Sequence, residues 1–357
     1  MKKRTAFPIL MLMVFVTVMA QGTRPVRDPI GYVWAPNPMN RLMDYLLSSA
    51  HSDAELPPLV AGICPHDDFL YAGPVYLPIM RRIHTKEVII FGVTHHDVRL
   101  AMKDPKNVLI MDAYDNWKGP YGPVAISPFR EILKKELPTG DYMVSNKAQA
   151  LEHSIEGMVP FLQYFNRKIK ITPVMVTGMS FERMEKLSSE MAKIIVNYMK
   201  KNNLKPGRDV FFLISSDANH YGEDFDNTVF GKGEKGHDAA VANDWRIARE
   251  FLSGKVTVKK IQSEMAATED GKALWCGRYS IPFGMLTTMK VLQALNPSKE
   301  MTGHVLRYAD TYSNGPIPLR KTGFGVTAPF SLQHWVGHLS MGYWLGNGEK
   351  APAKAGK

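Results

Sequence analysis

Three short apolar runs, each ending abruptly in polar residues, constrain the fold of this chain more than any other feature. They span residues 59–64 (LVAGIC), 88–93 (VIIFGV) and 210–214 (VFFLI). Continuous apolar runs of this length are typical of strands that are buried on both faces of a largely parallel sheet. Apolar residues at helical spacing between and after them predict helices over 180–202, 238–252 and 281–295. The sequence therefore predicts an α/β protein with a largely parallel or mixed sheet.

Another β-like run, residues 169–176, contains Pro173. Proline cannot donate a hydrogen bond to a neighbouring strand, so it is usually confined to an edge strand or to the start of a strand. We therefore expect this strand to lie at an edge or to begin near the proline.

The residues that follow the three apolar runs are of types that bind metals or move protons. The first run is followed by His66, Asp67 and Asp68, the second by His95 and His96, and the third by Asp217 and His220. In open α/β sheets ligands bind beyond the carboxyl ends of the strands. We therefore expect the three strand ends to face one cleft.

Cys276 is the candidate third metal ligand beside His66 and His95. It lies just ahead of the predicted helix over 281–295, and a helix N-terminus favours the thiolate form of a cysteine. Two imidazoles with one thiolate or carboxylate leave coordination positions open for water, substrate or dioxygen. Only two cysteines are present, which excludes a four-thiolate zinc or iron–sulfur site.

Four further residues are candidates for orienting the ligands or for moving protons: Glu152, His153, Asp217 and His220. A neutral imidazole accepts a proton near neutral pH, and a carboxylate can orient a metal-bound histidine. The alternative for such residues is helix capping and ordinary structural hydrogen bonding.

Five motifs, in this order, resemble the Memo-like family, protein B of the AmmeMemoRadiSam system. They are PHDDFLYAG from Pro65, FGVTHHD from Phe91, EHSIEGMVPFL from Glu152, SSDANHYG from Ser215 and CGR from Cys276. The family is similar in fold to class III extradiol dioxygenases (LigB-like), so the resemblance implies a single-domain α/β/α sandwich. It also implies a metal site at His66, His95 and Cys276, with Asp217 and His220 lining the same pocket.

The first motif departs from the family's usual PHAGY. Asp67 and Asp68 follow His66 directly, and either carboxylate could replace or supplement the thiolate of Cys276. The result would be a two-histidine, one-carboxylate site of the oxygen-activating iron type. The remaining potential ligands are His96 and Glu152.

Two functions remain open. The first is a metal-dependent oxidoreductase of the dioxygenase type, with Fe(II) at the site and an enediol-like or phenolic substrate. The second is a non-catalytic protein that holds copper, zinc or iron, or a peptide, in the same cleft; a thiolate with two imidazoles favours Cu(I) or zinc over Fe(II). A zinc hydrolase has the least support, because no clear general-base glutamate adjoins the ligands.

The first twenty residues have the form of a secretory signal peptide. Lys2, Lys3 and Arg4 precede the apolar run over 6–20, which ends in small residues. Cleavage would leave a periplasmic or extracellular domain over 21–345, without a membrane span, and a disordered tail over 346–357. An uncleaved anchor is the alternative, although fifteen residues are short for a membrane span.

The formal charge of +10 does not indicate a nucleic-acid partner, because the basic residues are scattered without interleaved aromatics. The glycine-rich stretch 231–236 (GKGEKG) follows no strong strand and is expected to be a surface loop rather than a dinucleotide site. His334 and His338 are spaced for one helix face, where we expect packing against aromatic neighbours. Export also makes a disulfide between Cys64 and Cys276 conceivable, which would compete with metal binding. Nothing in the sequence indicates an oligomeric state.

Overall fold

The computed structural model of the chain describes residues 22–50, 55–319 and 323–346. The predicted signal peptide lies outside these residues. Of the predicted tail only Gly346 is described, and it is the last residue of a strand rather than part of a disordered segment. None of the helices in the described part of the chain is long and apolar enough to cross a bilayer.

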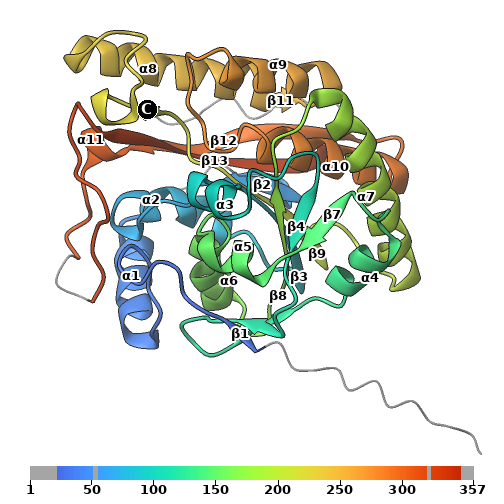
Figure 1. Cartoon of the computed structure of the whole chain (residues 1–357). Coiled ribbons are helices and arrows are strands. Elements are labelled where there is room, and N and C mark those ends of the chain that lie inside the picture. The colour runs from blue at the N-terminus through green and yellow to red at the C-terminus, as the bar shows by residue number, and fades with distance from the viewer. Residues whose placement is uncertain (1–21, 51–54, 320–322, 347–357) are drawn as a thin grey trace, which may run out of the picture.

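A mixed sheet runs through the molecule (Figure 1). Its order is β1 (Thr23–Arg24), β5 (Asn116–Trp117), β6 (Val124–Ile126), β8 (Lys170–Val176), β3 (Glu87–Gly92), β9 (Val210–Ser215), β2 (Ala61–Cys64), β13 (Trp335–Gly346), β12 (Glu300–Asp310) and β11 (Gly254–Lys255). Pairing off this path are β4 (Leu109–Met111), β7 (Tyr142–Val144) and β10 (His220–Tyr221). The neighbours β8, β3, β9 and β2 are all parallel, whereas β13 runs antiparallel to β2.

Helices cover both faces of the sheet, which confirms the predicted α/β sandwich. One face carries α4 (Phe129–Glu136), α7 (Phe181–Lys201), α9 (Val258–Glu269) and α10 (Ser280–Leu295), and the other carries α1 (Pro36–Ser48), α2 (Phe69–Met80), α3 (His96–Ala101), α5 (Asn146–Leu151) and α6 (Val159–Phe165). Side chains of each strand alternate between the two cores, so Ile89 and Phe91 face α10 while Val88 and Ile90 face the other layer. The remaining helices are α8 (Gly233–Ile247) and α11 (Thr311–Asn314).

Two of the three predicted helices have the predicted bounds. The hydroxyl of Ser180 accepts a hydrogen bond from the backbone N–H of Arg183 and so caps α7, as expected for an N-cap serine. The helix predicted from Asp238 begins earlier, at Gly233, and continues past α8 as a π-helical turn, Ala248–Leu252. The prediction of a surface loop over 231–236 is therefore partly wrong: its last four residues form the first turn of α8.

The prediction that β8 is an edge strand, or starts near Pro173, is also wrong. Pro173 lies in the middle of β8 and pairs in register with Ile90 of β3. On the other side of β8, β6 pairs only with Lys170 and Ile171, and β4 pairs only with Met175 and Val176. The proline falls between these two partners, where no N–H donor is required.

Candidate metal site

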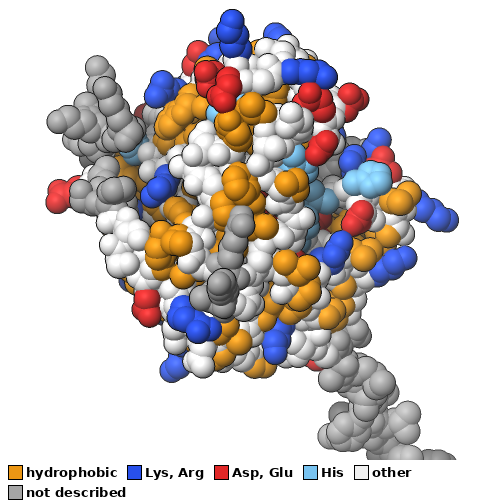
Figure 2. All heavy atoms as spheres, turned by 90° about the vertical axis from the view of Figure 1, so that its left-hand side faces the viewer, with side chains coloured by type: hydrophobic (Ala, Val, Ile, Leu, Met, Phe, Trp, Pro, Cys, Tyr) orange, Lys and Arg blue, Asp and Glu red, His pale blue; other side chains and the backbone are white. Residues whose placement is uncertain are grey.

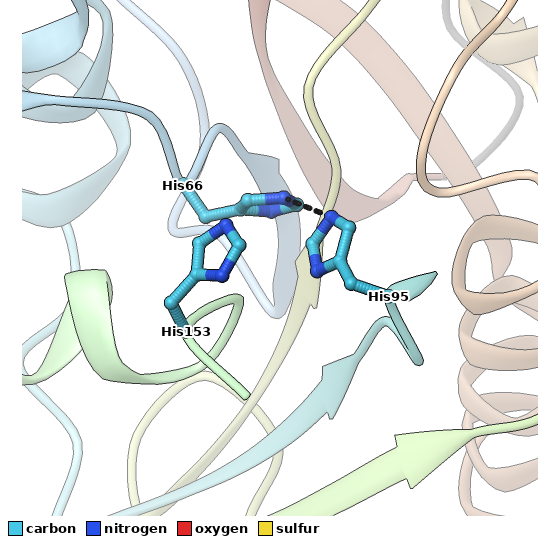
Figure 3. Close-up of side chains that lie close together, drawn as sticks. All are labelled: His66, His95 and His153. Carbon is cyan, nitrogen blue, oxygen red and sulfur yellow. Dashed lines mark hydrogen bonds between the residues drawn. The ribbon is translucent and has the colours of Figure 1, made fainter. Parts of the chain in front are cut away.

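The three predicted strand ends lie side by side, because β3, β9 and β2 are consecutive neighbours in the sheet. His66 follows β2, His95 follows β3, and Asp217 follows β9, and Cys276 approaches from the segment before α10. Figure 3 shows the rings of His66, His95 and His153 turned toward one another. The expected cleft at the carboxyl ends is present.

The hydrogen bonds of His66 define which of its ring nitrogens is free. Its Nδ1 lies 2.7 Å from the hydroxyl oxygen of Ser215, and that hydroxyl donates its hydrogen to the carbonyl of Ser154 at 2.6 Å. The hydroxyl can therefore only accept from His66, so Nδ1 carries the hydrogen and Nε2 carries a lone pair. Burial, then the neighbouring charge of His95, lowers the pKa of His66 well below its usual range, in agreement with a neutral ring.

His95 is oriented in the same way by a carboxylate. Its Nδ1 lies 2.7 Å from Oε1 of Glu152, and its backbone N–H donates to Oε2 of the same residue at 2.9 Å. Glu152 is buried, and this contact leaves Nε2 of His95 directed at Nε2 of His66, 3.4 Å away. A histidine whose other nitrogen is bonded to a buried carboxylate is the usual arrangement around a protein-bound metal.

Three potential ligand atoms lie close to Nε2 of His66. Around Nε2 of His66 lie Nε2 of His95 at 3.4 Å, Oδ2 of Asp217 at 3.3 Å and Sγ of Cys276 at 3.3 Å. Two nitrogen or oxygen ligands of a tetrahedral ion, each about 2.0–2.1 Å from it, lie about 3.3–3.4 Å apart. Each of these atoms, paired with Nε2 of His66, therefore has the spacing of two ligands on one ion.

Without a proton or a cation between them, the two free imidazole nitrogens would repel each other. Nε2 of His66 and Nε2 of His95 both carry lone pairs and face each other across 3.4 Å. Two ligand groups meet the spacing of a metal site among the described residues: His66 with His95 and His153, and His66 with Asp217 and Cys276. Both need Nε2 of His66, so one ion at a time can use this nitrogen, and neither group joins His95 with Asp217 or Cys276.

Cys276 and Cys64 are both free thiols, so the conceivable disulfide is not present. Cys64 is buried in the apolar core beneath α2. Burial, followed by the charge of Asp217, raises the pKa of the Cys276 thiol well above its usual range. The backbone N–H of Asp217 donates to Sγ at 3.0 Å, but α10 begins only at Ser280. Cys276 thus lies ahead of the helix and does not gain the expected thiolate form from its N-terminus. With its pKa raised by burial, the thiol would lose its proton only beside a cation.

Two further histidines face the same space. His153 stacks on His95 with ring centroids 4.5 Å apart, and burial, then the charge of His95, lowers its pKa to about 4. The Nδ1 of His220 lies 3.3 Å from the carbonyls of Ala218 and Leu274, which leaves Nε2 as an acceptor. Burial also lowers the pKa of His220 to about 4. Both rings are neutral at pH 7 and able to accept a proton.

The site opens into a cavity of about 410 Å³. Besides His66, His95, His153, Asp217 and His220, it is lined by Arg27, Asp28, Pro29, Ile30, Tyr32, Asp67, Asp68, Phe225, Thr327, Ala328, His334 and Val336. Figure 2 shows histidine side chains in a hollow on this face, bordered by hydrophobic and acidic groups. A cavity of this size holds a small organic ligand.

The extra carboxylates of the first motif are engaged elsewhere than at the ligand cluster. Oδ2 of Asp67 lies 2.8 Å from Nε2 of His338, and Asp68 accepts hydrogen bonds from the backbone and hydroxyl of Thr327. Neither residue belongs to the groups with metal-ligand spacing found among the described residues. The side chain of His96 is 76% exposed in α3 and does not line the cavity. The structure thus places Asp67 and Asp68 along the cavity and the side chain of His96 outside it.

The helical placement of His334 and His338 is wrong. His338 is buried within β13, and His334 lies just before this strand, because the segment pairs with β12 as a long hairpin. The His334 ring does pack on an aromatic neighbour, Phe225, with centroids 4.3 Å apart. The i,i+4 spacing is equally compatible with a strand, in which the two side chains again share a face.

An N-terminal segment that the sequence did not indicate completes the site. The hydroxyl of Tyr32 donates to the carbonyl of His66, and the guanidinium of Arg24 donates to the carbonyl of Glu152 and pairs with the buried carboxylate of Glu156. The backbone N–H groups of Arg27 and Asp28 also donate to Glu156. This segment thereby ties together the loops that carry His66 and Glu152.

Comparison with known proteins identifies the family. The family model described as Memo-like protein matches residues 32–316, a stretch that contains all five motifs. The chain belongs to the Memo-like family. Among curated relatives, a MEMO1 family protein of Saccharolobus islandicus is 33% identical over 166 residues, 44% of this chain and 52% of that protein. The MEMO1 family protein of Aquifex aeolicus is 29% identical over 185 residues, which are 51% of this chain and 61% of that protein. The one of Saccharolobus solfataricus is 30% identical over 200 residues, which are 54% of this chain and 64% of that protein. The match thus spans between about half and two thirds of the relatives' length.

Proposed function

We propose that this Memo-like protein holds one divalent metal ion between His66, His95, Asp217 and Cys276 and uses it for oxidoreductase chemistry of the extradiol dioxygenase type. The observation that carries the proposal is that Nε2 of His95, Oδ2 of Asp217 and Sγ of Cys276 each lie 3.3–3.4 Å from Nε2 of His66, with Nδ1 of both histidines held by other residues. A metal such as Fe(II) would supply Lewis-acid and redox chemistry toward an enediol or phenol and dioxygen.

The residues around the ligands fit the needs of such a substrate. His153 and His220 are neutral bases whose side chains line the cavity, so either can take the proton that a phenolic hydroxyl loses on binding. Phe225, with Ile30 near the opening, gives an apolar surface for a planar ring. In ring cleavage of a catechol both atoms of dioxygen enter the product, so no external reductant is needed.

Metal analysis of protein purified without chelator tests the site. We expect close to one ion per chain in the wild type and a large loss in the His66→Ala and Cys276→Ser variants. His96→Ala is the matched control, because this exposed histidine adjoins His95 in sequence but lies outside the cluster. Equal, substoichiometric metal in all four proteins would rule out the site.

A metal carrier is the second candidate function. It is favoured by the donor set itself, since one thiolate and two imidazoles bind Cu(I) or zinc more readily than Fe(II). Oxygen uptake by the iron-loaded protein with a panel of catechols separates the two functions. Uptake that depends on His220 supports the oxidoreductase, whereas tight copper or zinc binding without any uptake supports the carrier.

A further inference from the structure

The buried side chain of Asp244 on α8 contacts both loops that supply the acidic and thiol ligands. Its Oδ1 accepts a hydrogen bond of 2.7 Å from the indole N–H of Trp275. Its Oδ2 accepts one of 2.8 Å from the hydroxyl of Tyr308 and a longer one of 3.4 Å from the backbone N–H of Asn219. One carboxyl group therefore joins three elements that are far apart in the sequence.

Two of these contacts lead directly to the ligand cluster. Trp275 immediately precedes Cys276, and Asn219 lies two residues beyond Asp217. The third contact, to Tyr308, leads to β12, which supplies no ligand. The hydrogen bonds to Trp275 and Asn219 can therefore affect the positions of metal ligands, whereas the one to Tyr308 holds a strand that carries no ligand.

The two ligand loops are also bonded to each other. The side-chain oxygen of Asn219 accepts from the backbone N–H of Leu274 at 2.8 Å, and the backbone N–H of His220 donates to the carbonyl of Leu274 at 3.1 Å. Asn219 and Trp275 form an isolated antiparallel bridge. Asp244 thus binds a unit of two loops and not two independent segments.

We propose that Asp244 is a positioning residue that sets the relative placement of Asp217 and Cys276 for one metal ion; this inference rests on the proposed function. Metal ligands must lie within about 0.2 Å of their ideal distances, so a small shift of the Trp275 backbone moves Sγ of Cys276 out of range. A hydrophobic side chain could fill the same space without the free-energy cost of removing a carboxyl group from water. What the carboxyl group provides instead is a set of hydrogen bonds that fixes the geometry of the two ligand loops. The space is closely fitted, because a Cβ on Gly337 of β13 would lie 2.8 Å from Oδ2 of Asp244.

Two variants separate positioning from stability. Trp275→Phe removes the donor that leads to Cys276, and Tyr308→Phe removes a donor to the same carboxyl that leads to no ligand. Each protein is titrated with Co²⁺ while the thiolate-to-metal charge-transfer absorption is recorded, and its thermal unfolding is measured in parallel. We expect Trp275→Phe to weaken Co²⁺ binding by about 10–100-fold and to reduce the charge-transfer intensity per bound ion.

Tyr308→Phe should lower the unfolding temperature but leave the Co²⁺ affinity and the spectrum of the wild type. Equal Co²⁺ affinity in the two aromatic variants, whether both are weakened or neither, overturns the positioning role. A wild type that binds no Co²⁺ overturns the metal site itself, which distinguishes that failure from the failure of this inference.

Discussion

Replacement of Arg24 by methionine should destabilise this protein more than any surface charge change. The side chains of Arg24 and Glu156 are 2% and 1% exposed and form an ion pair, and Arg24 also donates to the carbonyls of Gln149 and Glu152. Removing one partner of a buried pair leaves an uncompensated charge and typically costs about 3–5 kcal/mol. We expect Arg24→Met to lower the free energy of unfolding by this amount at neutral pH.

The cost should depend on pH. Burial raises the pKa of Glu156 in the folded protein even though Arg24 opposes the rise. Without Arg24 that pKa rises further, and a group whose folded pKa lies above its unfolded value loses its stabilising contribution as the pH rises. The penalty of Arg24→Met should therefore be larger at pH 8 than at pH 5, where Glu156 can bind a proton in the folded state.

Urea unfolding followed by circular dichroism, at both pH values, measures these differences. Arg27→Met is the matched control: its guanidinium is 43% exposed and pairs with an exposed carboxylate of Asp97, so it should cost about 0–1 kcal/mol. The double variant Arg24→Met with Glu156→Gln should regain part of the loss. A cost for Arg24→Met that equals the control, or that is independent of pH, would refute the reasoning.

Two further predictions concern the carboxylates behind the site. Glu152→Gln should weaken metal binding by about 10–100-fold, because Glu152 holds both the ring and the backbone of His95; competition with a chelator measures it. Burial raises the pKa of Asp244 from 3.8 to about 7 in the folded protein. This shift corresponds to a contribution of about 4 kcal/mol to the free energy of unfolding. The contribution is present below about pH 4, where the group is neutral, and is lost as the pH rises through 7. The difference in unfolding free energy between the wild type and Asp244→Asn should change by about that amount from pH 4 to pH 8, and a constant difference would contradict the assignment.

The ends of the central strands could be predicted because their signal is local. Each of β2, β3 and β9 is a continuous apolar run, and the first polar residues after it necessarily lie at the same edge of a parallel sheet. This rule places His66 and His95 at the carboxyl edge of the sheet, where the structure has them. The partners that set their tautomers come from other segments or carry no signal of their own: Glu152 is a candidate to which the sequence assigns no partner, and Ser215 is one residue of the SSDANHYG motif.

The rest of the site depends on contacts between distant segments, for which the sequence has no local signal. His338 has the spacing of a helix face, and only its pairing with β12 turns it toward Asp67. Arg24 and Asp244 are charged residues that would ordinarily be assigned to the surface, yet each is buried by elements more than thirty residues away. Such burial follows from the tertiary arrangement and not from periodicity.

Pro173 separates two functions of one strand. Before the proline, β8 pairs with β6, which continues through β5 to β1 in the N-terminal segment. After the proline, β8 pairs with β4, and β4 pairs in turn with β7, which precedes α5 and Glu152 in the chain. A residue with a free N–H at this position would offer a hydrogen-bond donor, to which β6 or β4 could bond if its register along β8 shifted. The proline thus leaves β6 and β4 paired to separate halves of β8, one toward the N-terminal segment and the other toward the carboxylate that orients His95.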